Sequence, residues 1–412
     1  MLFSKISTLL YKLRSLYYEF PRQFWIIAFG VLISSAGSSM IWPFQLIYVS
    51  NTLAMPISAV TTLITISSIT ALSASPLGGF IADRFGRRNL MIFAQVSHGL
   101  AYVLMSFAHS YVGFLIPMTL IGAAMPLYSV GSDAMMADMI PTEKRSSAYS
   151  VLRMINNTGI AIGPAIGGII VAKSYQLGFI IAAIGMFGYG IYLTFFVKET
   201  LNTGIQTEKT EGSEHLIAGY LKVFADKKYL AFLSSFTIGI MAPMLLWMLL
   251  AVYTNKFFAI KESQYSLIPM TNAIMCVFIQ YPITLLIRKM ETRRAITLGM
   301  FFYAIGVGSV ALMTSFWGFW LSMVIMTFGE LIAIPTATKF IADLAPADLR
   351  GRYMSLYWLS WGISRAFAPL LGGILYDQVA PIAIWWGGLT LGLVSTIILF
   401  IISKNKSFQI AS

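Results

Sequence analysis

Long apolar runs separated by short polar turns make up most of the chain. A helix needs about 20 predominantly apolar residues to cross a bilayer. The sequence therefore predicts an all-α membrane protein with twelve transmembrane helices. We place them at residues 24–48, 57–81, 89–108, 111–137, 146–172, 176–197, 229–254, 264–288, 295–314, 316–342, 351–376 and 381–403.

The longest polar interval lies between the sixth and seventh predicted helices and is the natural linker between two halves. The division predicted from it is an N-terminal segment (1–23), a six-helix bundle (24–197), a linker (198–228), a second six-helix bundle (229–403) and a tail (404–412).

An internal repeat supports this division. The stretches Ala137–Ile170 and Ala342–Leu375 align without a gap, and ten of their thirty-four positions are identical. The identical positions include one Asp, one Arg, two Pro and a Gly pair, which shared hydrophobicity alone would rarely supply. We therefore expect two pseudo-repeated bundles of six helices each.

Charged residues are scarce, at 11% of the chain, whereas a soluble domain usually carries about 25%. The net charge of +12 does not indicate nucleic-acid binding, because Lys and Arg lie in short clusters between apolar runs. Of the 28 Lys and Arg, 22 fall on one side of the predicted topology and three on the other. The positive-inside rule then predicts a cell-membrane protein with both termini on the cytoplasmic side.

Little in the sequence indicates catalysis or metal binding. Cys276 is the single cysteine, so an intrachain disulfide or a thiolate zinc site is not expected, and the three histidines are far apart in sequence. Neither a hydrolase motif nor a phosphate-binding loop is present. We predict a protein that is not an enzyme and has no cofactor or metal.

A polar turn after the second predicted helix reads GGFIADRFGRRNLM, from Gly78 to Met91. Oppositely charged groups on one short turn could form a conformational latch, with the acidic end of the fourth helix or the start of the eleventh, near Gly351, as partner. The alternative is a well-capped turn with basic flanks. The latch candidates are Gly79, Asp83, Arg84, Gly86, Arg87, Arg88 and Asp138.

Twelve predicted helices, a central linker and the G-x-x-x-D-R-x-G-R-R turn resemble the major facilitator superfamily. Within it, the fifth helix is similar to the Gly-Pro motif of drug/proton antiporters, and Gly329-Glu330 with the following Ala342-Asp343 is similar to bacterial multidrug exporters. Met118 stands where such antiporters often carry an arginine. The resemblance implies a bacterial, proton-coupled exporter of small molecules.

The Gly-Pro motif allows two interpretations. A proline removes a backbone hydrogen bond and bends a helix, whereas glycines let a neighbouring helix approach closely. The motif therefore predicts either a functional bend or packing alone. Its residues are Gly159, Gly163, Pro164, Gly167 and Gly168.

Four of the charges inside predicted helices are candidates for a functional role, because a charge costs about 3 kcal/mol at the bilayer centre. At 1.5 Å per residue, Glu330 and Arg365 lie about 20 and 22 Å from the inner face, and Asp133 and Arg153 about 7 and 12 Å. We predict one acid–base pair in each half. Glu330 is the candidate proton carrier, and the alternative is a permanent ion pair that joins two helices.

The resemblance also implies a central cavity lined mainly by the first, fourth, seventh and tenth helices. Aromatic and Met side chains make adaptable apolar surfaces, although a Trp can equally anchor a helix at the lipid interface. The candidate cavity residues are Trp42, Phe44, Gln45, Met118, Met125, Asn156, Asn157, Trp247, Trp358 and Trp361.

These observations together predict a monomeric secondary transporter that exports lipophilic small molecules in exchange for protons, by rocking of its two halves across the bilayer. The alternatives are nutrient uptake, movement of a lipid-linked substrate, and a sensor on the same fold that transports nothing. The sequence leaves open the substrate, the direction of coupling and the choice between protons and sodium.

Overall fold

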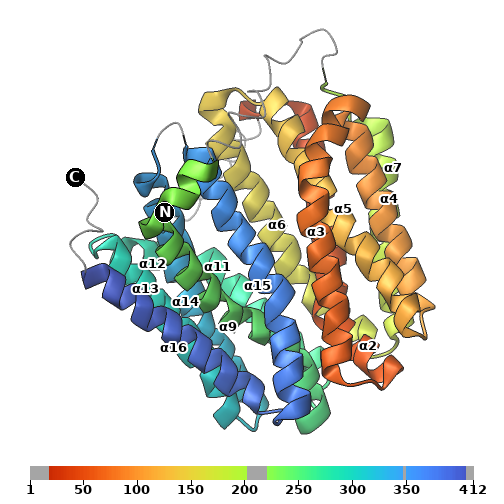
Figure 1. The fold of residues 1–412 in the computed structure, drawn as a ribbon. Coiled ribbons are helices and arrows are strands. Elements are labelled where there is room, and N and C mark those ends of the chain that lie inside the picture. Colours follow the sequence, from red (N-terminus) through yellow and green to blue (C-terminus); the bar gives the residue numbers. More distant parts are fainter. Residues whose placement is uncertain (1–17, 202–219, 347–348, 405–412) are drawn as a thin grey trace, which may run out of the picture.

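A computed structural model describes residues 18–201, 220–346 and 349–404, and the elements assigned within them are helices (Figure 1). The first set comprises α2 (Arg22–Leu53), α3 (Ile57–Phe85), α4 (Arg87–Ser106), α5 (Tyr111–Met139), α6 (Thr142–Val171) and α7 (Tyr175–Phe196). The second set comprises α9 (Lys227–Phe258), α10 (Glu262–Tyr265), α11 (Leu267–Phe278), α12 (Gln280–Ile287), α13 (Thr292–Ser309) with the 3-10 turn η1 (Val310–Leu312), α14 (Phe316–Leu344), α15 (Arg350–Gln378) and α16 (Ala383–Lys404).

The helices are long and apolar enough to form a multi-pass membrane protein. Within the described ranges, nine helices meet both criteria, and a tenth span is obtained when α10–α11 and α12 are counted as one bent helix. Helices α4 and α15, of 20 and 29 residues, are long enough to cross a bilayer but less apolar. This arrangement is consistent with the twelve predicted spans.

The predicted span 264–288 differs from the others because it is broken. Helices α11 and α12 meet at a bend of 57° near Ile279. Pro282 lies in the first turn of α12 and has no N–H to donate to the carbonyl of Phe278, so one helical hydrogen bond is missing at the bend. Because of the bend, α12 buries none of its residues.

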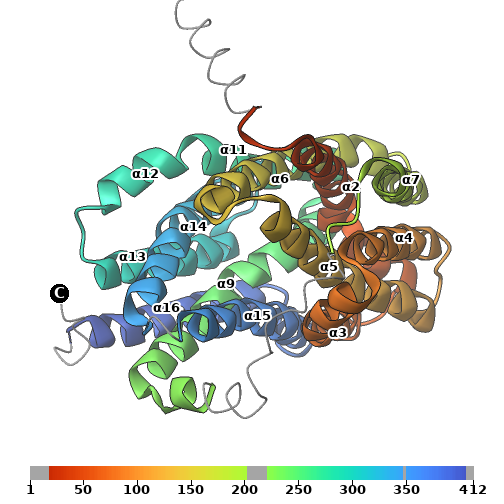
Figure 2. The same cartoon turned by 90° about the horizontal axis from the view of Figure 1, so that it is seen from above.

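The two sets lie side by side when the bundle is seen from above (Figure 2). Most contacts between them come from three places: α3 packs against α15, α6 against α10 and α11, and α2 against α9. The boundary between the sets therefore runs through the middle of the molecule.

Glycines on one face of α6 bring this helix close to α2. A side chain at Gly159, Gly163 or Gly167 would overlap atoms of α2, and one at Gly168 would overlap α10. Helix α6 continues without interruption through Pro164. Close packing thus accounts for the glycines of the Gly-Pro motif, and a functional bend stays a prediction.

The bundle has two ends that differ in charge. We call the end with the α3–α4 turn at Gly86 and the α12–α13 turn at Lys289 the basic end; in Figure 1 the α3–α4 turn is at the top and α12 is at the left. The opposite end is closed by contacts between the two sets. There, the Asp377 carboxylate accepts the backbone N–H groups of Ile57 (3.1 Å) and Ser58 (2.6 Å).

Candidate functional site

A cavity of about 1210 Å³ lies between the two sets. Its walls come from α2, α3 and α6 on one side and from α9, α11, α12, α14 and α15 on the other. It extends from Trp42 and Trp247 to Lys339 and Ala342, which lie in the last two turns of α14 at the basic end. The molecule is therefore hollow toward the basic end and packed at the opposite end.

Two indoles, Trp42 and Trp247, close the inner end of this cavity, next to the closed end of the bundle. We call this inner end the roof of the cavity. Trp42 of the first set and Trp247 of the second have ring centroids 5.6 Å apart. Met244 and Met248, from the same helix as Trp247, also line the cavity. These side chains offer a large and adaptable apolar surface.

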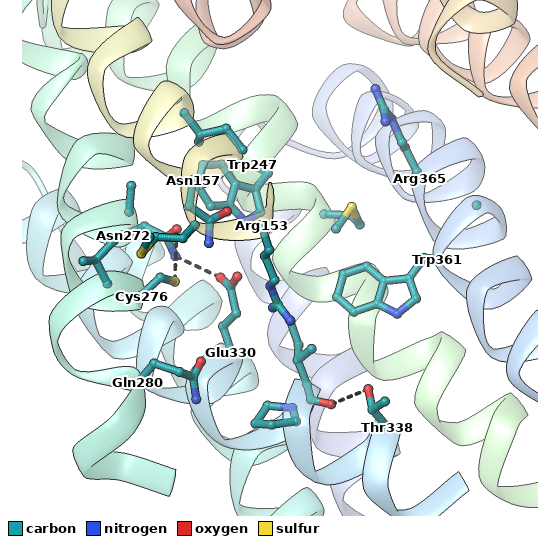
Figure 3. Close-up of a pocket in the computed structure, with 18 of the residues that line it drawn as sticks. Arg153, Asn157, Trp247, Asn272, Cys276, Gln280, Glu330, Thr338, Trp361 and Arg365 are labelled. Atoms are coloured by element: carbon teal, nitrogen blue, oxygen red, sulfur yellow. Dashed lines mark hydrogen bonds between the residues drawn. The ribbon is translucent and has the colours of Figure 1, made fainter. Parts of the chain in front are cut away.

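Glu330 is held in the cavity wall by Asn272 (Figure 3). The Asn272 Nδ2 donates to Glu330 Oε2 at 2.9 Å and also to Thr327 Oγ1 at 3.0 Å. Thr327 and Glu330 lie three residues apart on α14, so one amide from α11 fixes the carboxylate orientation across a helix–helix contact. Asn272 was not among the residues predicted from the sequence, where its signal is a polar amide within an apolar run.

The predicted pairing of Glu330 with Arg365 does not form. Figure 3 shows Arg365 across the cavity from Glu330, whereas Arg153 extends from α6 beside the carboxylate. None of the ion pairs within the described part of the chain contains Glu330, although Arg153 does act on it electrostatically. Residue spacing gave the depth of Arg365 but not the side of α15 on which it lies.

The second predicted pair, Asp133 with Arg153, is also not formed. Asp133 lies near Ser129 on its own helix (3.5 Å), and its backbone carbonyl accepts the Tyr149 hydroxyl (3.3 Å). Arg153 instead lines the cavity together with Glu330 and Arg365. The charges that the sequence assigned to separate halves thus face one shared space.

The predicted cavity residues fall into two groups. Trp42, Asn157, Trp247 and Trp361 line the cavity. Phe44 and Met118 are buried in the core instead. Gln45, Met125, Asn156 and Trp358 also lie outside the lining. Further lining residues, which were not predicted from the sequence, include Ser68, Met154, Asn272, Cys276, Gln280 and Thr338.

The α3–α4 turn is held by a carboxylate from another helix end. Gly86 has φ +93°, in the left-handed region that glycine favours. The Glu199 carboxylate, just past α7, accepts the backbone N–H groups of Arg87 (3.1 Å) and Arg88 (3.0 Å). It therefore caps α4, whose first amides have no partner within the helix. Glu199 was not among the predicted residues.

Arg87 also forms an ion pair with Asp138 at the end of α5. Arg88 donates to the Thr194 carbonyl of α7 at 2.7 Å. Asp83 and Arg84 are exposed. An added Cβ at Gly79 would meet nothing within 4 Å. Arg87, Arg88 and Asp138 of the predicted latch thus have partners, whereas Asp83 and Arg84 are exposed.

A sequence model of the Major Facilitator Superfamily matches residues 27–257 and 229–409. The chain belongs to this superfamily. One relative is a Na(+), Li(+), K(+)/H(+) antiporter of Planococcus maritimus, 25% identical over 390 residues that cover 87% of this chain and 88% of that protein. Another is the multidrug resistance protein MdtH of Escherichia coli O1:K1 / APEC, 22% identical over 301 residues that cover 73% of each protein.

The fold of the superfamily is also seen in solved structures. The nucleoside transporter NupG superposes with a TM-score of 0.79 over 93% of this chain and 100% of that chain, at 10% sequence identity. Identity this low shows the fold alone. The protein is therefore a major facilitator transporter with membrane-spanning helices rather than an enzyme.

Proposed function

We propose that this transporter exports lipophilic small molecules in exchange for protons, by alternating access. The observation that supports it most is the cavity between the two sets, because it opens toward one end and contains a titratable acid, Glu330, in its wall. The antiporter and multidrug relatives support the same direction of transport. The cavity lies within one chain, which supports a monomer as the working unit.

We place the basic end on the cytoplasmic side of a bacterial cell membrane, following the positive-inside rule. The described conformation is then inward-open. Substrate would enter from the cytoplasm or the inner leaflet and contact the indoles and methionines of the roof. A rocking motion of the two sets would close the basic end and open the opposite one.

Glu330 and Arg153 are the proposed coupling residues, because they lie on different sets and face the same cavity. Attraction between a carboxylate and a guanidinium across the cavity favours the conformation in which they are closest. Protonation of Glu330 removes that attraction and shifts the balance between the two conformations. Asn272 would keep the carboxyl group in place in both protonation states.

The test is Glu330→Gln in proteoliposomes with an imposed pH gradient, assayed with a panel of fluorescent lipophilic compounds. The amide keeps the shape and the acceptor for Asn272 but cannot exchange a proton. We expect gradient-driven efflux to fall to the level of protein-free vesicles, while compound binding persists. Glu291→Gln, which removes a carboxylate from the α12–α13 turn, is the control. Unchanged gradient-driven efflux in the Glu330 variant would contradict the proposal.

The turn after α3 is the proposed latch, and helix register supports it. Gly373 of α15 packs against Thr61 of α3, and eleven residues along each helix Gly362 packs against Leu72. Another eleven residues lead to Asp83 and Gly351, where Gly351 has nothing within 4 Å of an added Cβ. Closure of the basic end would then bring the Asp83 carboxylate to the first turn of α15, where a helix N-terminus favours an anion.

A further inference from the structure

Arg365 occupies the deep part of the cavity, on α15 (Figure 3). Its side chain is half-buried, and no hydrogen bond or ion pair of its guanidinium is found within the described residues. A cation inside a membrane-spanning helix is expensive and is usually matched by an acid or by backbone carbonyls. Arg365 is therefore a half-buried charge inside the cavity, and the described residues supply no partner for it.

The backbone around Arg365 is fixed from both sides. The carbonyl of Ala366 accepts the hydroxyl of Thr65 from α3 at 2.7 Å. Ser364 donates to the carbonyl of Thr237 in α9 at 2.9 Å. Because these bonds hold α15 between α3 and α9, the helix cannot easily rotate to move the guanidinium out of the cavity.

The other charges of the cavity have counterparts. Lys339 pairs with Asp343 at 3.0 Å near the basic end. Arg153 and Glu330 act on each other across the cavity. Arg365 alone remains uncompensated among the charged lining residues that the structure describes. The deep part of the cavity thus carries an excess positive charge.

We propose that Arg365 binds an acidic group of the substrate, so that the transported molecules are amphiphilic organic acids. This inference rests on the proposed function only in taking the cavity as the substrate site. A guanidinium presents a planar fork that matches a carboxylate, sulfonate or phosphonate with two parallel hydrogen bonds. A lipophilic cation would instead meet a like charge at the same point.

The surroundings of Arg365 suit such a molecule. Ser68 lines the cavity from α3, between Thr65 and Leu72, which contact α15 at Ala366 and Gly362. Its hydroxyl can therefore donate to the same acidic group. The apolar body of the ligand would lie against Trp247 of α9 and Trp361 of α15, which also line the cavity.

The first experiment compares two probes of nearly equal shape, 1-naphthaleneacetate and 1-naphthaleneacetamide. Binding to the full-length protein in lipid nanodiscs is measured by calorimetry at neutral pH without any ion gradient. We expect the acid to bind at least about tenfold more tightly than the amide, because a hydrogen bond between charged groups is stronger than a neutral one. Failure of the acid to bind more tightly than the amide overturns the proposal.

Variants locate this preference. Arg365→Gln should remove the acid's advantage and leave the amide's affinity unchanged, which also shows that the cavity is intact. Arg365→Lys should keep part of the advantage, because it retains the charge without the fork. Lys173→Gln removes an exposed cation of the α6–α7 turn, outside the cavity lining, and should change nothing. An undiminished acid preference in Arg365→Gln overturns the assignment.

Cys276 gives an independent measurement, because it is the only cysteine of the chain and lines the cavity. The acid should slow its alkylation by N-ethylmaleimide in the wild type but not in Arg365→Gln. Equal protection in both proteins overturns the proposal. These readouts need no transport, so a failure of proton-driven efflux and a failure of acid binding are seen separately.

Discussion

Glu199 joins two helices through a single side chain. Its carboxylate accepts two amides of α4, and Oε1 also accepts the backbone N–H groups of Thr200 (2.9 Å) and Leu201 (3.1 Å). The same turn contains the Arg87–Asp138 ion pair, so α4, α5 and α7 are tied together at the basic end. A carboxylate at a helix N-terminus is favourable both as a hydrogen-bond acceptor and through the helix dipole.

We expect Glu199→Ala to lower the stability of the protein by about 1 kcal/mol, the usual effect of losing a helix cap, and its Tm by roughly 2 °C. Thermal unfolding in detergent measures the change. Lys198→Ala removes the neighbouring exposed side chain and should leave Tm unchanged. An equal shift in both variants would argue against a capping role for Glu199.

Among single residues, the sequence predicted which charges lie within the membrane better than it predicted their partners. Glu330 follows from an acid in an apolar run, and its depth from the rise of a helix. Its contact with Asn272 could not be predicted, because it depends on how α11 packs on α14. For the same reason, the separation of Arg365 from Glu330 could not be predicted, since spacing within one helix does not fix its rotation relative to another.

Individual elements were predicted well where apolar runs are long. The position of each of the twelve runs corresponds to described helices. In eleven cases the run is a continuous span, and the exception is the run 264–288, which is broken between α11 and α12. Pro282 lies at this break, but Pro43, Pro164 and Pro243 lie inside unbroken helices, so a proline alone does not identify a broken span.

In helix α3 the sequence spacing does correspond to one packing face. Thr61, Thr65, Ser68 and Leu72 recur at helical spacing and form a stripe along the face toward α15.

Gly79 continues that stripe toward the basic end. We expect Gly79→Leu to reduce the maximal transport rate while substrate binding is preserved, because its side chain has room here but would block closure against α15. Asp83→Asn should have the same effect more weakly. Flux measured over a range of substrate concentrations separates the two parameters.

The matched control is Gly188→Leu on α7, where an added Cβ also meets nothing within 4 Å. It should leave both parameters unchanged. A pure loss of affinity with a normal maximal rate in Gly79→Leu or Asp83→Asn would rule out the latch.

At the scale of the whole molecule, the described conformation depends on contacts that join the two sets at the opposite end. Asp377 of α15 caps α3, and Tyr175 of α7 donates to Glu262 of α10 at 2.7 Å. Both contacts must break when this end opens. Their strength therefore sets part of the balance between the two conformations.

We expect Asp377→Ala to favour opening of this end, because it leaves the first amides of α3 without their acceptor. The measurement is labelling of Cys276 in intact cells by a membrane-impermeant maleimide added outside, which should increase several-fold. Ser110→Ala removes a cap of similar kind at the same end but within one set (Gly113 N–H to Ser110 Oγ, 3.1 Å). Equal labelling in both variants would show that Asp377 does not hold the sets together.

The packed roof has an electrical consequence. Water in a cavity that is open at the basic end extends the potential of that aqueous phase to Glu330 and Arg365. The membrane voltage then falls mainly across the closed layer beyond Trp42 and Trp247, rather than evenly over the bilayer. An elementary charge that crosses this layer experiences nearly the full drop, worth about 2.3 kcal/mol per 100 mV. The voltage drop therefore begins at the two indoles, and a transported charge responds to the membrane voltage mainly while it passes through the packed layer next to them.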